Sequence, residues 1–314
     1  MLRTLSFAAV AATFATAGLA ADLPSKKSVP ALVADDASAV HGFVDMGYAS
    51  GRVTGGGVPL YKSGTALLQT TAGVSFDLYK NKGGFINSVS VFGGGFAESY
   101  QNAPAGTDHM QEYDWWAGAT VGFADYYKLS VQSLNFHIVG AGNGVVVKNA
   151  TATLSYDDAH LGLPIALNPS VTVFYNMNGG DPAMSKGKTG SYRVDLAIAP
   201  GYSFAKSSGI PLSVSVPTSI SFGPKDMYYT VTTGCGANLS HVCSTSTFEM
   251  FSTGLQAKYD LGQVIPKKFG AWSAKAGVQY YQFLNDAIKA NQGAPGPVGK
   301  SNFTVISAGL GVAF

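Results

Sequence analysis

The last stretch of the chain, residues 301–314, most limits the fold, because its side chains alternate without interruption from Ile306 onward. Successive side chains of a β-strand point to opposite sides, so the pattern predicts one apolar face and one small or polar face. A strand of this kind fits a transmembrane barrel, whose closure leaves no unpaired backbone edge in lipid. The apolar face carries Ile306, Ala308, Leu310, Val312 and Phe314, and the other carries Ser307, Gly309, Gly311 and Ala313.

Residues 1–20 predict a cleaved signal peptide. Arg3 supplies a positive charge, residues 5–17 form an uncharged apolar run, and Ala20 ends a small-residue cleavage site. The alternative is a single membrane anchor, but this run is shorter than the roughly 20 residues that a bilayer needs. Cleavage removes one positive charge and lowers the formal net charge from +2 to about +1. That balance gives no reason to expect nucleic acid as a partner.

The composition favours a chain whose strands face lipid on one side and water on the other. Only 12% of the residues are charged, against roughly 25% in ordinary soluble domains. Glycine, tyrosine and phenylalanine are abundant, yet no apolar run after the signal is long enough for a transmembrane helix. These features fit a barrel with one lipid-facing and one water-facing side. The competing class is a secreted soluble all-β protein, whose surface should carry more charge.

About twelve alternating segments follow, which predicts an all-β, antiparallel up-and-down barrel; ten or fourteen strands are the alternatives. Three irregularities stand out. The alternation in residues 127–138 changes phase near Ser133, which predicts a bulge that turns Leu134 and Phe136 outward. Gly93–Gly95 suggest a bulge or a sharp bend, and Pro217 has no explanation from sequence. The segments are 41–49, 66–79, 85–98, 113–124, 127–138, 145–156, 165–177, 192–204, 212–222, 248–261, 272–283 and 301–314.

The connections alternate in length, as short periplasmic turns and long external loops would. Short ones follow the even-numbered segments, and the longest follow the first, seventh, ninth and eleventh. Residues 21–40 contain two prolines and no periodicity, so they predict a linker that either hangs in the periplasm or plugs the lumen. The barrel domain is therefore expected to span residues 41–314. Tyrosine and tryptophan near strand ends fit two interfacial girdles: Tyr48, Tyr79, Trp115, Tyr156, Tyr175, Tyr202, Tyr259 and Trp272.

Both ends of the mature chain resemble bacterial outer-membrane proteins. The last strand, ending in Phe314, resembles their C-terminal signature, and ADLPSKK at residues 21–27 resembles the mature start of many alphaproteobacterial barrel proteins and porins. The resemblance implies export to the bacterial outer membrane, contact with its lipid, and Phe314 as a signal to the barrel-assembly machinery. ADLPSKK covers a small part of the chain and names no substrate.

Cys235 and Cys243 lie in one long connection. In an oxidising compartment they predict a disulfide that ties this loop. His241 lies between them, so a Cys/His metal site is the alternative, but a fourth ligand is missing nearby. We expect no metal and no cofactor.

An outer-membrane lipase would need a serine and a histidine on the lipid-facing surface, within hydrogen-bond reach of each other. Ser133, Asn135 and His137 share one face, which the predicted phase change turns toward the lumen. We therefore interpret them as a polar lumen stripe. No nucleophile elbow or phosphate-binding loop appears, so the chain is not expected to be an enzyme.

The lumen is the remaining candidate site. Twelve strands lie between a filled interior and a wide water channel, so a narrow or partly plugged pore is expected. We predict a passive channel for a small polar solute, gated by the long external loops. The alternatives are a non-conducting structural or adhesive barrel and, third, an enzyme. The predicted lining is Asp45, Gln69, Asp77, Gln132, Asn168, Arg193, Asp195, Gln256, Lys258, Lys275 and Gln279.

Overall fold

The fold is that of a computed structural model. It describes residues 39–53, 59–60, 66–81, 83–100, 110–138, 145–163, 165–178, 190–205, 209–224, 247–285 and 301–314. The predicted signal peptide, nearly all of the predicted linker and both cysteines lie outside these ranges. The first wall strand begins at Val40, one residue before the predicted start of the barrel.

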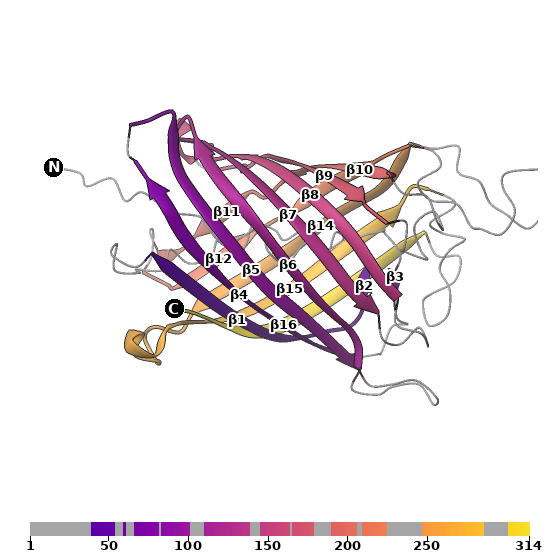
Figure 1. Ribbon diagram of the computed structural model, residues 1–314. Helices are drawn as coiled ribbons and strands as arrows, with labels where there is room; N and C mark the ends of the chain where they lie inside the picture. The colour runs from indigo at the N-terminus through magenta and orange to yellow at the C-terminus, as the bar shows by residue number, and fades with distance from the viewer. Residues whose placement is uncertain are drawn as a thin grey trace, which may run out of the picture.

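The wall consists of antiparallel strands that pair with their neighbours in sequence (Figure 1). Strands β10 and β11 form one wall strand, interrupted for two residues, and β12 and β13 form another, so fourteen elements make twelve wall strands. The elements are β1 (Val40–Ala49), β4 (Leu67–Lys80), β5 (Ile86–Tyr100), β6 (Met110–Phe123), β7 (Tyr127–Ile138), β8 (Val145–Tyr156), β9 (Ser170–Asn176), β10 (Tyr192–Ile198), β11 (Gly201–Ser203), β12 (Leu212–Ser215), β13 (Thr218–Phe222), β14 (Phe248–Asp260), β15 (Ala271–Phe283) and β16 (Asn302–Ala313).

The barrel closes between its first and last strands. β16 pairs with β15 on one side and with β1 on the other, in a register that joins Val44 to Val312 and Tyr48 to Ala308. The C-terminal alternation therefore forms the closing strand, and the prediction of a closed barrel of twelve strands is confirmed.

The short and the long connections lie at opposite ends of the barrel, as predicted. The short ones after β4, β6, β8, β11 and β14 lie at the left of Figure 1, together with the end of β16. We call this the turn end and the opposite end the loop end. The turn end includes two short 3-10 helices, η2 (Ala159–Leu161) and η3 (Lys267–Phe269). None of the described helices has the length and apolar character needed to cross a membrane.

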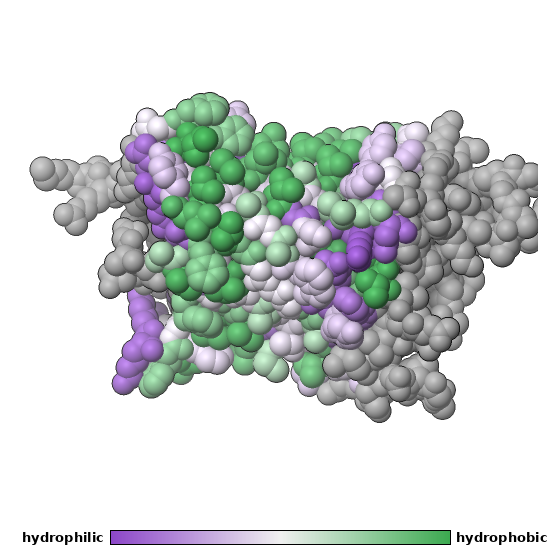
Figure 2. Space-filling view, viewed as in Figure 1, coloured by the Kyte–Doolittle hydropathy of each residue, from purple (hydrophilic) through white to green (hydrophobic). Residues whose placement is uncertain are grey.

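The wall is apolar outside and polar inside over most of its area. Outward residues such as Leu78 and Ile306 are each 62% exposed, and Figure 2 shows the outer surface as a broad green field. Inward residues of the same strands, such as Ser75 and Asp77, are polar and largely shielded. This polarity is what a barrel in lipid requires.

The predicted phase change in β7 is wrong. β7 pairs with β6 and β8 in unbroken register throughout its length. Leu134 and Phe136 therefore point inward, where they are 1% and 6% exposed, and His137 lies on the outward face. The sequence pattern changes because polarity reverses between the two faces, while the backbone continues without an inserted residue.

The glycine run of β5 also forms no bulge. Gly93–Gly95 pair regularly with both neighbouring strands, and the irregular positions of β5 lie near its two ends. Gly94 is needed for space: a Cβ there would lie 2.5 Å from Cζ2 of Trp116 and 2.5 Å from the carbonyl oxygen of Ala72. The glycine lets the indole of Trp116 lie across the inner face of β5.

Pro217 lies in the short gap between β12 and β13, and Pro200 lies in the matching gap between β10 and β11. The pairing register is the same before and after both gaps. Val216 N–H donates to the oxygen of Pro200 at 2.8 Å, and Gly254 N–H donates to the oxygen of Pro217 at 3.0 Å. The proline therefore interrupts the ladder locally, because it has no N–H to donate, while the wall continues past it.

Candidate functional site: the barrel interior

Inward side chains form rows across neighbouring strands, because the registers align them. One row, the second inward row from the turn end on β5–β8, consists almost entirely of hydroxyl groups. Within it Thr120 and Ser130 lie 3.1 Å apart, and Thr153 and Thr172 lie 3.0 Å apart, oxygen to oxygen. Such pairs satisfy each other and leave a neutral, hydrophilic wall. The row is Ser90, Thr120, Ser130, Thr153, Thr172, Asp195 and Ser221.

Arg193 and Asp195 form a buried ion pair on β10. Arg193 is 0% exposed and Asp195 1% exposed. The guanidinium binds both carboxylate oxygens, with Nε 2.8 Å from Oδ1 and Nη2 donating to Oδ2 at 2.9 Å. The guanidinium carbon also lies 5.4 Å from the ring centre of Phe174. The two charges therefore neutralise each other within the inner wall.

Two further charge groups lie between the turn end and the middle of the wall. Asp45 on β1 pairs with Lys275 on β15, two strands that are separated by β16. Asp77 accepts a hydrogen bond from His41 Nε2 at 2.9 Å and pairs with Lys80 Nζ at 2.7 Å. The predicted mixture of positive and negative lining groups is thus arranged as compact pairs.

A hairpin after β1 carries a fourth charge group, at the loop end. It consists of β2 (Arg52–Val53) and β3 (Pro59–Leu60). The guanidinium of Arg52 lies 2.8 Å from Glu112 and 3.3 Å from Glu98, counted between the nearest nitrogen and oxygen atoms. Gln69 Nε2 donates to Glu98 at 2.8 Å. These contacts fix the hairpin against the inner face of β5 and β6.

The electrostatics of this cluster favour a charged Arg52. Burial by itself would lower the pKa of the guanidinium, but the negative charges of Glu112 and Glu98 outweigh burial and raise the pKa above its ordinary value. The ring of Phe96 also lies 5.5 Å from the guanidinium carbon. Arg52 was not among the residues that the sequence analysis selected, because it lies between two predicted strands and outside any alternating pattern.

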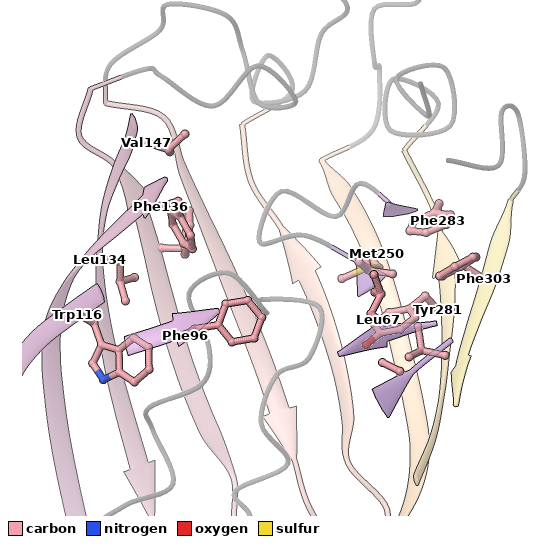
Figure 3. Packing of buried hydrophobic residues seen from close by; sticks show 14 of the residues in the cluster. Leu67, Phe96, Trp116, Leu134, Phe136, Val147, Met250, Tyr281, Phe283 and Phe303 are labelled. Carbon is pink, nitrogen blue, oxygen red and sulfur yellow. The ribbon is translucent and has the colours of Figure 1, made fainter. Parts of the chain in front are cut away.

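Beside these charged groups, the loop-end half of the interior contains large apolar side chains, which the alternating pattern did not predict. Figure 3 shows two groups of buried side chains that face the lumen from opposite parts of the wall. One group comes from β5–β8 and the other from β4 and β14–β16. Inward positions near the loop end thus carry large apolar residues where small or polar ones were expected. The labelled residues are Phe96, Trp116, Leu134, Phe136 and Val147 in the first group, and Leu67, Met250, Tyr281, Phe283 and Phe303 in the second.

Three inward polar side chains between these regions have unused hydrogen-bonding atoms. The indole Nε1 of Trp116, Oε1 of Gln132 and both amide atoms of Asn149 make no hydrogen bond within the described part of the chain. Each side chain is at most 5% exposed. They belong to adjacent strands β6, β7 and β8, and the register places Trp116 and Asn149 on either side of Leu134 in one row. A polar solute or water molecule that reached this part of the wall would find free donors and acceptors.

The remaining predicted lining residues fall into two groups. Gln256 and Lys258 on β14 and Gln279 on β15 lie at positions that alternate inward, and Gln279 is 8% exposed. Asn168 lies outside the wall strands, in the connection between β8 and β9. Its side-chain amide donates to the oxygen of Ala199 at 3.3 Å, and its backbone N–H donates to Asp158. The role of all these residues in solute passage stays a prediction.

A closed antiparallel barrel with an apolar outer belt and charge pairs inside is a transmembrane β-barrel protein. No protein-family model matches the chain, and no curated protein does. Similar solved structures include outer-membrane barrels, and three of them illustrate how distant the similarity is.

The transport unit of the autotransporter AIDA-I from Escherichia coli is 13% identical, with a TM-score of 0.41 over 90% of this chain and 92% of that one. The translocator domain of the autotransporter NalP from Neisseria meningitidis is 12% identical, with a TM-score of 0.38 over 96% and 99%. Outer membrane phospholipase A from Escherichia coli is 8% identical, with a TM-score of 0.39 over 87% and 89%. Likenesses this distant carry no argument about function, and the barrel rests on its own strand pairing.

Proposed function

We propose that the protein is a porin-like passive channel of the bacterial outer membrane for small polar solutes. The observation that carries the proposal is the polar inner wall, in which a row of hydroxyl groups crosses neighbouring strands and the charged groups form compact ion pairs. A hydrophilic interior inside an apolar belt gives polar solutes a route that lipid denies them.

The loop-end cluster of apolar side chains and the β2–β3 hairpin define where such a channel would be narrowest. Arg52 holds the hairpin against Glu98 and Glu112, and the side chains of Phe96 and Trp116 face the same region. Passage would therefore be controlled at the loop end, and the turn end would act as a polar vestibule. This arrangement supports a narrow pore with low conductance.

Conductance of the purified full-length protein in planar lipid bilayers tests the proposal. The expected result is discrete conductance steps that are absent from a mock preparation purified in parallel. A barrel that is correctly folded, as shown by a heat-sensitive shift in gel mobility, yet gives no steps at any voltage would contradict the channel.

The apolar cluster favours a second candidate, a non-conducting structural or adhesive barrel. Leu67, Tyr281 and Phe283 are each 0% exposed, so water is excluded around them. A barrel that is closed at this level would span the membrane without passing solute. The same bilayer recordings separate the two functions.

We expect no enzymatic activity. Ser133, Asn135 and His137 do share the outward face, which is the face that a lipid-cleaving site would use. However, Ser133 and His137 are four residues apart on one strand, roughly 13 Å, so the histidine cannot activate the serine directly. A lipase assay of the folded protein should give the same background rate as a Ser133→Ala variant.

The cellular address and assembly partner belong to the same proposal. The apolar belt requires outer-membrane lipid as a surrounding partner, and Phe314 at the end of the closing strand supports recognition by the barrel-assembly machinery. Cell fractionation tests the address, with the protein expected in the outer-membrane fraction as a chain that starts at Ala21. Replacement of Phe314 by alanine is expected to reduce the assembled amount.

A further inference from the structure

The outward residues of β7 are polar near the loop end and apolar nearer the turn end, and β8 adds an outward lysine beside them. Going from the turn end, the outward residues of β7 are first apolar, at Leu129 and Val131, and then polar at Ser133, Asn135 and His137. Figure 2 shows purple side chains in the green wall over the right-hand ends of these strands. Opposite them, on the inner face, lie apolar residues of the loop-end cluster. The polarity of this part of the wall is therefore inverted.

The centre of this polar patch is a single row of three residues. Trp115 on β6 pairs with Asn135 on β7, and Asn135 pairs with Lys148 on β8. Side chains opposite each other on one face of a sheet lie about 5 Å apart. Trp115 is 49% exposed and Lys148 is exposed, whereas Asn135 between them is only 5% exposed. The row therefore presents an indole, an amide and an ammonium group side by side.

Lys148 is exceptional in its position. Among the wall strands in the described ranges, it is the only lysine or arginine at an outward position, and no aspartate or glutamate is exposed on the same face. It makes no ion pair with any described residue. An outward charge is costly in the hydrocarbon core and tolerated only near the headgroups.

The neighbours of the row place it at headgroup depth. Tyr113 on β6 is 48% exposed and stacks on His137, with ring centres 4.7 Å apart. Exposed tryptophan and tyrosine rings of membrane proteins gather where hydrocarbon meets headgroups. A positive charge and an amide at that depth face the phosphates of the surrounding lipid.

We propose that Trp115, Asn135 and Lys148 form a binding site for the phosphate-bearing headgroup of a lipid in the outer leaflet. The ammonium of Lys148 pairs with the phosphate, the Asn135 amide donates a hydrogen bond to it, and the indole of Trp115 contacts the first carbons of the acyl chain. The complementarity of charge selects an anionic lipid, because no carboxylate competes among the outward residues of the described wall strands. The proposed site depends on the barrel lying in lipid. It does not depend on the lumen conducting solutes, so it can exist even if the channel function is wrong.

Lipid retention by the full-length protein tests the site. The folded protein in neutral detergent micelles is titrated with phosphatidic acid, with diacylglycerol as the uncharged comparison, and bound lipid is counted by native mass spectrometry. Lys148→Gln removes the charge and keeps an unbranched polar side chain that is one atom shorter; we expect it to weaken phosphatidic acid binding about fivefold. Lys267→Gln, in the exposed η3 turn at the opposite end, is the matched control and should bind like the unmodified protein.

The outcomes separate the explanations. Unchanged retention by Lys148→Gln, or an equal loss in Lys267→Gln, overturns the proposal. Inorganic phosphate that competes as well as phosphatidic acid shows a simple anion site and also overturns it. A Lys148→Gln variant that binds lipid normally but dissociates an oligomer assigns the row to a protein contact. All variants are first checked for the heat-sensitive mobility of a folded barrel.

Discussion

Gly42 and Phe314 join the first and last wall strands. Gly42 N–H donates to the oxygen of Phe314 at 2.7 Å, and Phe314 N–H donates to the oxygen of Gly42 at 3.0 Å. The ring of Phe314 lies across the glycine, because a Cβ at position 42 would lie 2.4 Å from its Cε2 atom. The seam of the barrel thus depends on a residue without a side chain and on the terminal aromatic ring that covers it.

Replacement of Gly42 by alanine should therefore displace the Phe314 ring. We expect the free energy of unfolding to fall by about 1–3 kcal/mol, the usual cost of inserting atoms into a packed site. Guanidinium unfolding in micelles, followed by tryptophan fluorescence, measures it. Gly277→Ala is the control, because a Cβ there would make contacts no closer than 3.4 Å. In a Phe314→Ala background the effect of Gly42→Ala should largely disappear, and an undiminished effect would refute the ring contact.

Replacement of Arg52 by methionine should release the β2–β3 hairpin. Glu98 and Glu112 would lose their cation, and an uncompensated buried charge costs about 3–5 kcal/mol. The hairpin is therefore expected to leave the inner wall, and single-channel conductance should rise if the lumen conducts. The comparison is a triple variant in which Glu98→Gln and Glu112→Gln accompany Arg52→Met. It leaves no uncompensated carboxylate, so an equally large rise there would mean that unpaired charge is not what drives the hairpin from the inner wall.

Removing only one charge of the Arg193–Asp195 pair should strongly reduce the free energy of unfolding. Asp195→Asn leaves a guanidinium that is 0% exposed without its carboxylate, so we expect a loss of about 3–5 kcal/mol in unfolding free energy. The double variant Arg193→Met, Asp195→Leu should lose clearly less, because no unpaired charge remains. Guanidinium unfolding measures the unfolding free energy of both variants. Equal losses in the two variants would argue against an Arg193–Asp195 ion pair in the wall.

Cys235 and Cys243, which lie outside the described residues, remain predicted to form a disulfide. Iodoacetamide should label neither cysteine in the folded, unreduced protein and both after reduction, as read by mass spectrometry. A Cys235→Ser variant should then expose Cys243 to labelling without reduction. Labelling of both cysteines before reduction would contradict the predicted disulfide.

The strand pattern could be predicted from sequence because a lipid-facing wall imposes a period of two on every strand. The apolar residues of the last stretch, from Ile306 to Phe314, recur at every second position, so the closing strand was recognisable by itself. The interruption at Pro217 was visible too, although its partner gap at Pro200 could be identified only from the pairing of the two strands.

The candidate site was predicted less well, because alternation does not show which face of a strand points to lipid and which points to the lumen. In β7 the apolar residues Leu134 and Phe136 suggested an outward face after a bulge, yet they point inward in unbroken register. Nothing local distinguishes an apolar residue that faces lipid from one that fills a lumen. The only sequence signal was the outward Ser133, Asn135 and His137, which we interpreted in reverse.

The sequence by itself determined the spacing of strands and turns, because backbone geometry ties side-chain direction to residue number. The tertiary structure alone decided what meets inside the ring. Arg52 reaches Glu98 and Glu112 across long stretches of chain, and Asp45 reaches Lys275 only because closure brings β1 and β15 to either side of β16. Such contacts depend on register and closure, which are collective properties of all the strands and leave no mark on any single one.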